Sequence, residues 1–318
     1  MLPHLYSTNQ WRIFSISLTS PRLTLYRSQL KNILFIINPI SGGKDKRHFP
    51  DKIIQHLDSK KFNPDFVFTE RVNHARELAE QAINMGVDFV VAVGGDGTIN
   101  EVASVLVDSD QIMGIIPVGS GNGLARTLDI PINEKKAIQR LNDLRVDRID
   151  SGVFNKHHFF GIAGVGFDAH VSACFARNKT RGLRGYMHTV LSEVISYQPQ
   201  HYTIEIDGKV LHREAFIISI ANSSQYGNNT YIAPLASVKD GLLDVCIIRR
   251  FPLYYLPMVG FHLVNKTVHQ SKYIEVIKGK EIEIHREKAG IVHLDGEPEW
   301  MEEDLQIVVK PCSLHVIY

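Results

Sequence analysis

One stretch of the chain combines glycines, a carboxylate and a hydroxyl in the pattern that phosphate binding requires. The segment Val91–Val102 reads VAVGGDGTINEV. Glycines lack a Cβ, so their backbone N–H groups can lie directly against a ligand, and Asp96 stands among three of them. The spacing of Thr98 and Glu101 is typical of a capping box, which predicts a helix whose positive end faces the turn. A plain strand-to-helix turn is the alternative, and we favour the phosphate site.

Two further glycine-rich turns follow predicted strands. Lys31–Asn38 is an apolar strand that leads into PISGGK, whose spacing is not that of a Walker A loop. Gln111–Ile116 is another strand, and it leads into PVGSGNGLAR at Pro117–Arg126. Strands that alternate with helices form a parallel sheet whose turns gather at one edge. We therefore expect the three turns to form one site.

The elements that must position these turns are predicted by periodicity. Helices are expected at Pro50–Leu57, at His74–Met85 with Asn73 as its cap, and at Asn133–Leu144. Near residue 150 the pattern changes to short strands separated by turns, with helical patterns at Leu183–Tyr197 and Leu253–Val264 only. The expected organisation is a poorly packed extension at 1–30, an α/β domain at 31–148, a β-rich domain at 149–302, and strands at 303–318 that return to the first domain.

Composition excludes several classes of protein. The 318 residues carry a net charge of +1, which demands neither a nucleic acid nor an acidic partner. Cys174, Cys246 and Cys312 form no CxxC pair, which indicates reduced thiols in the cytoplasm. The longest membrane-span candidate, Gly241–Val264, is interrupted by charged residues. The protein is thus expected to meet any membrane from the cytoplasmic side, without a transmembrane segment.

Three acidic turns in the second half are candidates for chemistry. GVGFDA resembles a dinucleotide fingerprint but lies among strands, so we expect instead a turn that aims Asp168 into the interdomain cleft. Asp240 precedes a glycine and, on its residues alone, is better explained by a turn than by a cation site. The carboxylates of Asp295 and Glu297 are two residues apart and would share a face of a continuing strand. They could activate a hydroxyl beside a phosphate, or simply form an acidic hairpin.

A basic cluster near Gly182 and Gly185 has no acidic residue within it and contains Arg177, Lys179, Arg181 and Arg184. A solvated loop explains it. Contact with anionic lipid headgroups explains it equally, at about 1 kcal/mol per charge near the surface.

Taken together, these motifs resemble the diacylglycerol kinase catalytic family, in its bacterial-type lipid kinase form. The resemblance covers nearly everything after Leu30. The motifs that carry it are NPISGGK at Asn38–Lys44, GGDGTINEV at Gly94–Val102, PVGSGNGLAR at Pro117–Arg126, GVGFDAHV at Gly164–Val171, KDGLLD at Lys239–Asp244 and DGEP at Asp295–Pro298.

The resemblance implies a fold and a set of ligands. The fold is an N-terminal three-layer α/β nucleotide domain like that of NAD kinases, followed by a C-terminal β-sandwich, with the active site in the cleft between them. A lipid enters this cleft from a membrane surface, and a homodimer is compatible with the family. ATP and Mg²⁺ are the implied cofactors.

The resemblance also implies residue roles. Glu297 is the implied proton acceptor, with Asp295 beside it and Asp96 in the catalytic turn. The implied structural metal site is Asp240, helped by the carbonyls of Ser237 and Leu242, and Asp168 is assigned to the substrate. Residues implied in nucleotide binding are Asn38, Ser41, Gly42, Thr69, Gly94, Gly95, Asp96, Gly97, Thr98, Asn100, Ser120 and Asn122.

The acceptor lipid is left open by one departure from the family pattern. Diacylglycerol kinases resemble G-T-x-N-D-F-A where this chain has Gly119–Ala125, and Gly123 lacks the carboxylate. Sphingoid-base kinases look like S-G-N-A-L-A in this position. We predict phosphorylation of a primary hydroxyl of diacylglycerol, with a sphingoid base second, and an NAD kinase or a non-catalytic nucleotide- or lipid-binding protein as more remote alternatives.

Overall fold

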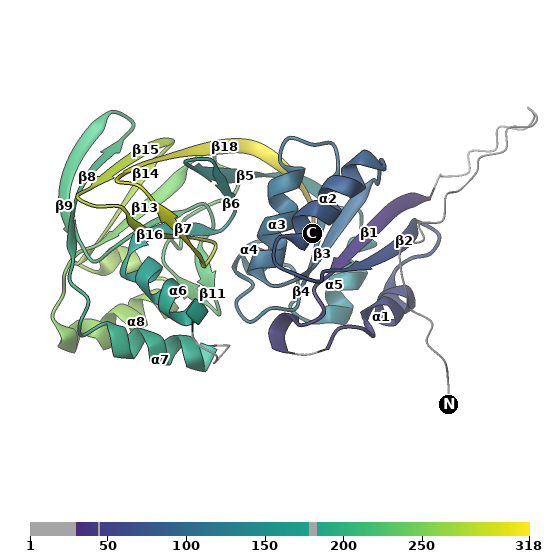
Figure 1. Ribbon diagram of the computed structural model, residues 1–318, viewed down its shortest axis with the longest axis horizontal. Helices are drawn as coiled ribbons and strands as arrows, with labels where there is room; N and C mark the ends of the chain where they lie inside the picture. Colours follow the sequence, from purple (N-terminus) through teal and green to yellow (C-terminus); the bar gives the residue numbers. More distant parts are fainter. Residues whose placement is uncertain (1–29, 44, 178–182) are drawn as a thin grey trace, which may run out of the picture.

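The computed structural model describes residues 30–43, 45–177 and 183–318 (Figure 1). The expected extension at 1–30 lies outside this range except for Leu30. Lys44 of the first glycine turn and Lys179 and Arg181 of the basic cluster also lie outside it. The described chain forms two halves, which a long C-terminal strand connects (Figure 1).

The first half is a parallel sheet with helices on both faces (Figure 1). The strand order is β2-β1-β3-β4, and each neighbouring pair is parallel. Helix α2 packs against α3, and α1 packs against α5. The bounds are β1 Lys31–Ile37, α1 Phe49–His56, β2 Phe62–Phe68, α2 His74–Asn84, β3 Phe89–Gly94, α3 Asp96–Leu106, β4 Ile112–Pro117, α4 Gly123–Thr127 and α5 Glu134–Leu141.

The strand order places a switch point between β1 and β3. The chain leaves β1 for β2 on one side and returns to β3 on the other side. In open α/β sheets, ligands bind outside the carboxyl ends of the strands at such a point. The glycine turns after β1 and β3 therefore lie where this architecture binds ligands.

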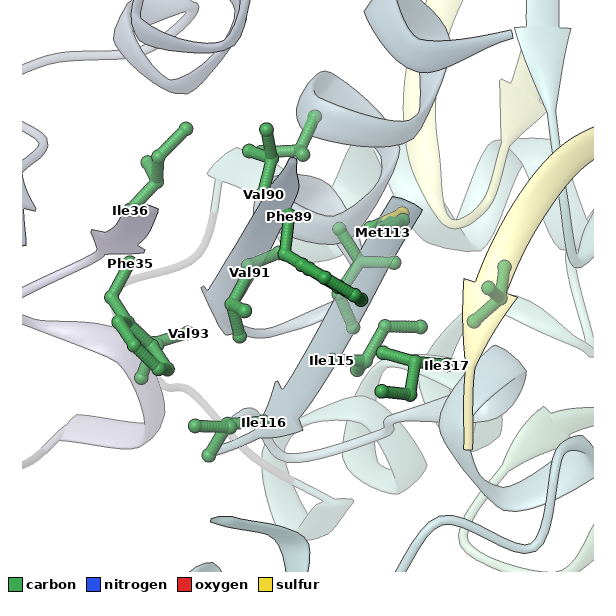
Figure 2. Close-up of a cluster of buried hydrophobic side chains, with 14 of the residues drawn as sticks. Phe35, Ile36, Phe89, Val90, Val91, Val93, Met113, Ile115, Ile116 and Ile317 are labelled. Atoms are coloured by element: carbon green, nitrogen blue, oxygen red, sulfur yellow. The ribbon is translucent and has the colours of Figure 1, made fainter. Parts of the chain in front are cut away.

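The core of the first half is built from buried strands. β3 is buried along its whole length, as expected for a parallel strand covered on both faces. Figure 2 shows how side chains from neighbouring strands fill the space beside the sheet, with Ile317 from the C-terminal end of the chain among them. The last strand is therefore part of the core of the first half.

The second half is a β-sandwich with helices along one side (Figure 1). One sheet has the order β14-β13-β10-β7-β16-β17, and β15, β8 and β9 belong to the other. Inner faces of both sheets meet in one cluster, to which Val165 and Val245 contribute from one sheet and Ile204 and Ile284 from the other.

The elements of the second half have the following bounds. They are β5 Val146–Phe154, β6 His157–Phe159, β7 Ile162–Gly166, α6 Phe167–Arg177, α7 Leu183–Glu193, β8 Gln200–Ile206, β9 Lys209–Ala215, β10 Ile217–Ala221, β11 Gln225–Gly227, β12 Thr230–Tyr231, β13 Leu243–Ile248, α8 Leu256–Val264, β14 Ile274–Gly279, β15 Glu281–Arg286, β16 Gly290–Leu294, β17 Glu297–Met301 and β18 Asp304–Ile317. Short 3₁₀ turns are η1 Ser41–Gly43, η2 Leu253–Tyr255 and η3 Val268–Gln270.

Strand β18 joins the two halves into one continuous sheet. It pairs with β15 near Ile307 and, further along, lies parallel to β4, with Val316 opposite Met113. Its pairing with β5 shifts register between Lys310 and Leu314, as at a β-bulge, which bends a strand. In Figure 1 it is the yellow strand that arches from one half to the other.

Two expectations about the second half are corrected by the structure. The segment after Gly166 is not a turn but the start of helix α6, which the sequence periodicity did not reveal. We also expected a single strand at His157–Ala163, and the structure has two strands there, β6 and β7, which are separated by Phe160 and Gly161. Among the described residues, no helix is long and apolar enough to cross a bilayer.

Candidate active site

The three glycine turns pack against one another through their backbones. A Cβ at Gly42 would lie 2.3 Å from the carbonyl oxygen of Val118, and one at Gly119 would lie 2.5 Å from the Cα of Gly95. These contacts leave no room for side chains, which explains why glycine occupies the positions. The turns after β1, β3 and β4 therefore form one surface lined by backbone, at the edge where the strands end.

Helix α3 begins directly after β3, and the capping-box prediction is wrong. Gly95 is extended at the N-cap, and Asp96 is already helical, so Thr98 lies within the first turn. Its hydroxyl accepts a hydrogen bond from Asn38 Nδ2 at 3.2 Å, which ties the turn after β1 to the helix. The N-cap is Gly95, so the helix starts three residues earlier than the T-x-x-E pattern predicted.

Glu101 stabilises a different helix from the one that the sequence indicated. Its carboxylate accepts the backbone N–H groups of Asn73 and Ala75 at 3.1 and 3.0 Å, at the start of α2. A carboxylate there satisfies unpaired N–H groups and interacts favourably with the helix dipole. Asn73 occupies the N-cap with a φ of 63° and makes no side-chain cap, so the cap predicted for Asn73 comes from Glu101.

Asp96 fixes the turn after β4. Its two carboxylate oxygens accept the backbone N–H groups of Asn122 and Gly123, each at 2.8 Å. Burial raises the pKa of Asp96 to about 6. The carboxylate thus holds two of the glycine turns together and is fully engaged with backbone.

The pKa of Asp96 gives a pH-dependent prediction. Because the folded-state pKa lies above the ordinary value of 3.8, the folded protein holds this proton more tightly than the unfolded chain. The resulting stabilisation is present below about pH 4 and is lost as the pH rises through about 6. Urea unfolding of the wild type and Asp96→Asn should show their difference in unfolding free energy falling over this interval. A difference that rises with pH would contradict the assignment.

Asn122 closes the same turn on itself. It has a φ of 57°, its Oδ1 accepts the N–H of Gly119 at 3.0 Å, and its Nδ2 donates to the carbonyl of that residue at 2.9 Å. The side chain is 1% exposed, so it shapes the turn from beneath. Ser120 is exposed and Ser41 half-buried. Of these three predicted nucleotide contacts, the two serines are the ones available to a ligand.

Asp295 and Glu297 do not share a strand face, because the chain reverses between them. Asp295 and Gly296 have φ values of 50° and 90° and form a two-residue turn with Leu294 opposite Glu297. Asp295 accepts backbone N–H groups from Phe160, Gly161 and Ile162 at 3.0, 2.7 and 3.1 Å, all at the break between β6 and β7. The pKa of Asp295 is raised because the carboxyl is buried.

Asn100 connects this turn to the first half of the chain. Its Nδ2 donates to Asp295 Oδ2 at 2.8 Å and to the carbonyl of His158 at 3.2 Å. Asn100 is on α3, whose first turn carries Asp96 and Gly97. One hydrogen-bonded set therefore fixes the β16-β17 turn to the glycine turns.

This arrangement brings Glu297 beside the start of α3. A Cβ at Gly97 would lie 3.2 Å from Glu297 Oε1. Residue 297 is exposed at the start of β17, and the carboxylate of Asp295 accepts four N–H groups. Of the two residues, Glu297 is the more exposed, and its carboxylate lies beside the N-terminus of α3.

Asp168 lies in a buried polar network and not in an open turn, and its assignment to the substrate stays a prediction. It is 6% exposed, and its Oδ2 contacts Ser219 Oγ, Tyr226 Oη and His293 Nε2 at 3.0, 3.2 and 3.1 Å. A Cβ at Gly164 would lie 2.4 Å from the same oxygen. The GVGFDA motif therefore makes room for a buried polar network at the start of α6.

The carboxylate of Asp240, a predicted metal ligand, contacts a lysine. Asp240 Oδ2 lies 2.7 Å from Lys278 Nζ, and Asp240 Oδ1 accepts the N–H of Leu242 at 3.2 Å. The same ammonium lies 3.2 Å from Asp244 Oδ2, which is buried. The hydroxyl of Ser237 accepts the N–H of Lys239 at 3.3 Å. Both oxygens of Asp240 thus have partners, and a cation at Asp240 would share the carboxylate with Lys278 or displace it. The metal assignment stays a prediction.

Removal of the lysine gives a second prediction. Lys278→Met would leave two carboxylates without their cation and should lower the unfolding free energy by about 2 kcal/mol, less than for a fully enclosed pair. Mg²⁺ should then raise the melting temperature of the variant but not that of the wild type. Lys280→Met, at an exposed position two residues further along the chain, is the control. An Mg²⁺ response in the wild type equal to that of the variant would show that the lysine does not exclude the ion.

Fold and site together define a class of protein. A parallel sheet with glycine turns at its switch point is suited to binding phosphates, and a carboxylate from a second domain faces it. This is the architecture of a two-domain kinase.

Comparison with known families identifies which kinases. Residues 32–154 match the diacylglycerol kinase catalytic domain, and residues 161–318 match the YegS C-terminal NAD kinase beta sandwich-like domain. The chain belongs to the diacylglycerol kinase catalytic family and is a lipid kinase, which confirms the resemblance, the fold class and the enzyme class expected from its sequence.

Individual relatives agree with this assignment. A diacylglycerol kinase of Bacillus subtilis is 27% identical over 273 residues, which cover 84% of this chain and 90% of the relative. A probable lipid kinase YegS-like protein of Chromohalobacter salexigens is 27% identical over 243 residues, 74% of this chain and 78% of the relative. The fold is similar to that of a putative diacylglycerol kinase from Bacillus anthracis, with a TM-score of 0.74, 22% identity, and coverage of 92% and 98% of the two chains.

Proposed function

We propose that the protein transfers the γ-phosphoryl group of ATP to a primary hydroxyl of a lipid, with Glu297 as the proton acceptor. The observation that carries this proposal is the position of Glu297, whose Oε1 lies 3.2 Å from where a Gly97 side chain would begin. The first turn of α3 directs its N–H groups and dipole toward the same place. A lipid hydroxyl placed between Glu297 and a phosphate at this end of α3 would lie beside the carboxylate that accepts its proton and beside the phosphorus that its oxygen attacks.

The glycine turns supply the nucleotide site in this proposal. ATP would provide the phosphoryl group, with Mg²⁺ neutralising the charge of its phosphates. Gly42, Gly95 and Gly97 present backbone, and the hydroxyls of Ser41 and Ser120 are accessible. Asp96 and Asn122 act as positioning residues, because their polar atoms bind the turn after β4. Thr98 and Asn38 hold the turn after β1 against α3.

The reaction requires one proton transfer by the protein. As the lipid oxygen bonds to the γ-phosphorus, the bond from that phosphorus to the β–γ bridging oxygen breaks, and ADP leaves. The hydroxyl proton passes to the carboxylate of Glu297. Asp295 is a positioning residue, since its four hydrogen bonds fix the turn that carries Glu297.

Exposed apolar side chains on one side of the second half support contact between the protein and a membrane surface. Met187, Leu191 and Ile195 are exposed at intervals of four residues in and just after α7, which places them on one helical face. Tyr254, Met258 and Phe261 are exposed on η2 and α8. Both segments cover the same buried cluster, to which α7 contributes Tyr186 and α8 contributes Leu256. We propose that this face contacts the bilayer when the lipid is bound, on the cytoplasmic side.

Diacylglycerol remains our first choice of acceptor. The Bacillus subtilis relative is named a diacylglycerol kinase. The missing carboxylate at Gly123 has a steric cause here, because a Cβ there would lie 3.0 Å from the carbonyl oxygen of Gln225. The glycine at position 123, where the diacylglycerol kinase pattern has a carboxylate, therefore follows from the packing of α4 against β11 and does not by itself favour a sphingoid base.

A comparison of acceptors tests the proposal. Purified protein with labelled ATP and Mg²⁺ would be given detergent micelles of diacylglycerol, micelles of a sphingoid base, or NAD in the same buffer. We expect labelled phosphatidic acid at the highest rate. Label in the sphingoid base alone would mean that a sphingoid base, and not diacylglycerol, is the acceptor. Label in NADP would mean that the substrate is a nucleotide and not a lipid. The absence of any labelled product would contradict the proposed activity.

A further inference from the structure

Three metal-ligand side chains meet between α6 and α7, in the second half of the chain. His170 and Cys174 are one turn apart on α6, and Glu193 is the last residue of α7. His170 Nε2 lies 2.8 Å from Glu193 Oε2 and 3.6 Å from Cys174 Sγ. All three ligand atoms lie within 4.8 Å of one another, and in the described part of the chain no other His, Cys, Asp or Glu residues form such a group.

The distances fit a tetrahedral ion. Zinc bonds of about 2.0–2.1 Å to nitrogen, about 2.3 Å to sulfur and about 2.1 Å to oxygen give ligand-to-ligand edges of roughly 3.6 Å for N–S and roughly 3.4 Å for N–O. The N–S distance of 3.6 Å already has this value. The N–O distance of 2.8 Å is that of a hydrogen bond and would open by about half an ångström. The change is within the reach of a glutamate rotamer.

The surroundings also suit an ion. The three residues are half-buried, so an ion can enter from solvent. The rings of Phe167 and Tyr197 lie on His170, with centroids 6.5 and 5.3 Å from it, and limit its movement. An apolar wall beside a mixed nitrogen, sulfur and oxygen set is typical of zinc-class sites.

We propose that His170, Cys174 and Glu193 bind one zinc-class divalent ion, with water as the fourth ligand. On binding, the thiol releases its proton to solvent, and the ion replaces the hydrogen bond between His170 and Glu193. The ion ties α6 to α7, the helix that carries the exposed face of Met187 and Leu191.

Cobalt titration tests this proposal, because Co²⁺ bound by a thiolate gives a charge-transfer band. Metal-free, reduced full-length protein is expected to bind one Co²⁺ per chain with this band, and Zn²⁺ should displace it. Cys174→Ser should abolish the band. Cys312→Ser, which changes an exposed cysteine elsewhere, should retain it. Glu193→Gln should weaken binding at least about tenfold, because it removes the charged oxygen ligand.

Thermal unfolding provides a second measurement. Zn²⁺ should raise the melting temperature of the wild type and of Cys312→Ser but not that of Cys174→Ser. Equal melting temperatures of all three proteins in chelator would show that the variants fold. Absence of the band in the wild type, or its persistence in Cys174→Ser, would overturn the site. Both measurements are independent of kinase activity, so they stand whatever the acceptor proves to be.

Discussion

Replacement of Glu297 by Gln is expected to lower kcat by about 10²–10⁴-fold, the usual contribution of a positioned general base. The amide has nearly the same shape and cannot accept the hydroxyl proton. Because residue 297 is exposed at a strand start, the unfolding free energy should change by less than about 0.5 kcal/mol. The KM for ATP should stay near the wild-type value, since the nucleotide is assigned to the glycine turns. Steady-state assays with lipid micelles and urea unfolding measure these quantities.

Glu299 provides a matched control for this substitution. It is exposed on the same strand, two residues further along, and pairs across the hairpin with Val292. Glu299→Gln removes the same charge and should leave kcat within about twofold, consistent with ordinary surface substitutions. Equal losses in the two variants would indicate that charge on this strand matters and that Glu297 has no role as a base.

Asp295→Asn should lower both the unfolding free energy and kcat. The carboxylate accepts four N–H groups from three backbone amides and Asn100, and an amide at this position can satisfy only part of them. Unsatisfied buried donors cost about 1–3 kcal/mol each, so the unfolding free energy should fall by about 3 kcal/mol. The turn that carries Glu297 would lose its position, and kcat should fall at least about tenfold.

A double mutant separates positioning from a purely structural role. If Asp295 acts through Glu297, the variant with both substitutions should have nearly the same kcat as Glu297→Gln alone. If the loss of kcat in the double variant equals the product of the two single losses, Asp295 contributes to catalysis by a route that does not depend on Glu297. Asp304→Asn, at an exposed position near the same hairpin, controls for removal of a charge and should unfold near the wild-type urea concentration.

The sequence was most informative where chemistry and secondary structure coincide. The buried strand β3 and the glycines after it depend on residues that are neighbours in the chain, so the parallel sheet and its glycine turns were predictable. The family motifs then indicated the carboxylates at Asp295 and Glu297. The reversal of the chain at Asp295 and Gly296 corresponds to the acidic hairpin that we kept as an alternative, and an Asp-Gly pair is itself a hairpin signal.

Interactions between distant segments could not be predicted. Glu101 caps a helix whose Ala75 lies 26 residues earlier in the chain, and a local T-x-x-E pattern imitates a cap that does not form. Asp150, completely buried, accepts N–H groups from Gly241 and Cys312, and no local motif marks it. Lys278 reaches Asp240 across 38 residues, so the sequence indicated the carboxylate but not the ammonium beside it.

Helix α6 was not predicted, because its buried residues do not follow the spacing of an amphipathic helix. Its buried residues include Phe167, Ala169 and Val171 in close succession, so no simple amphipathic pattern appears. The carboxylate of Asp168 is enclosed by Ser219, Tyr226 and His293, which come from three separate strands. Such a network becomes visible only when the strands are assembled.

The most direct test of the account is phosphoryl transfer to a natural lipid mixture. Purified wild-type protein and Glu297→Gln would be incubated with ATP, Mg²⁺ and a total lipid extract, and new phosphorylated species would be identified by mass spectrometry. We expect phosphatidic acid to accumulate with the wild type and to stay at background with the variant. Accumulation of phosphatidic acid at equal rates with both proteins, or no phosphorylated lipid with the wild type, would contradict the account.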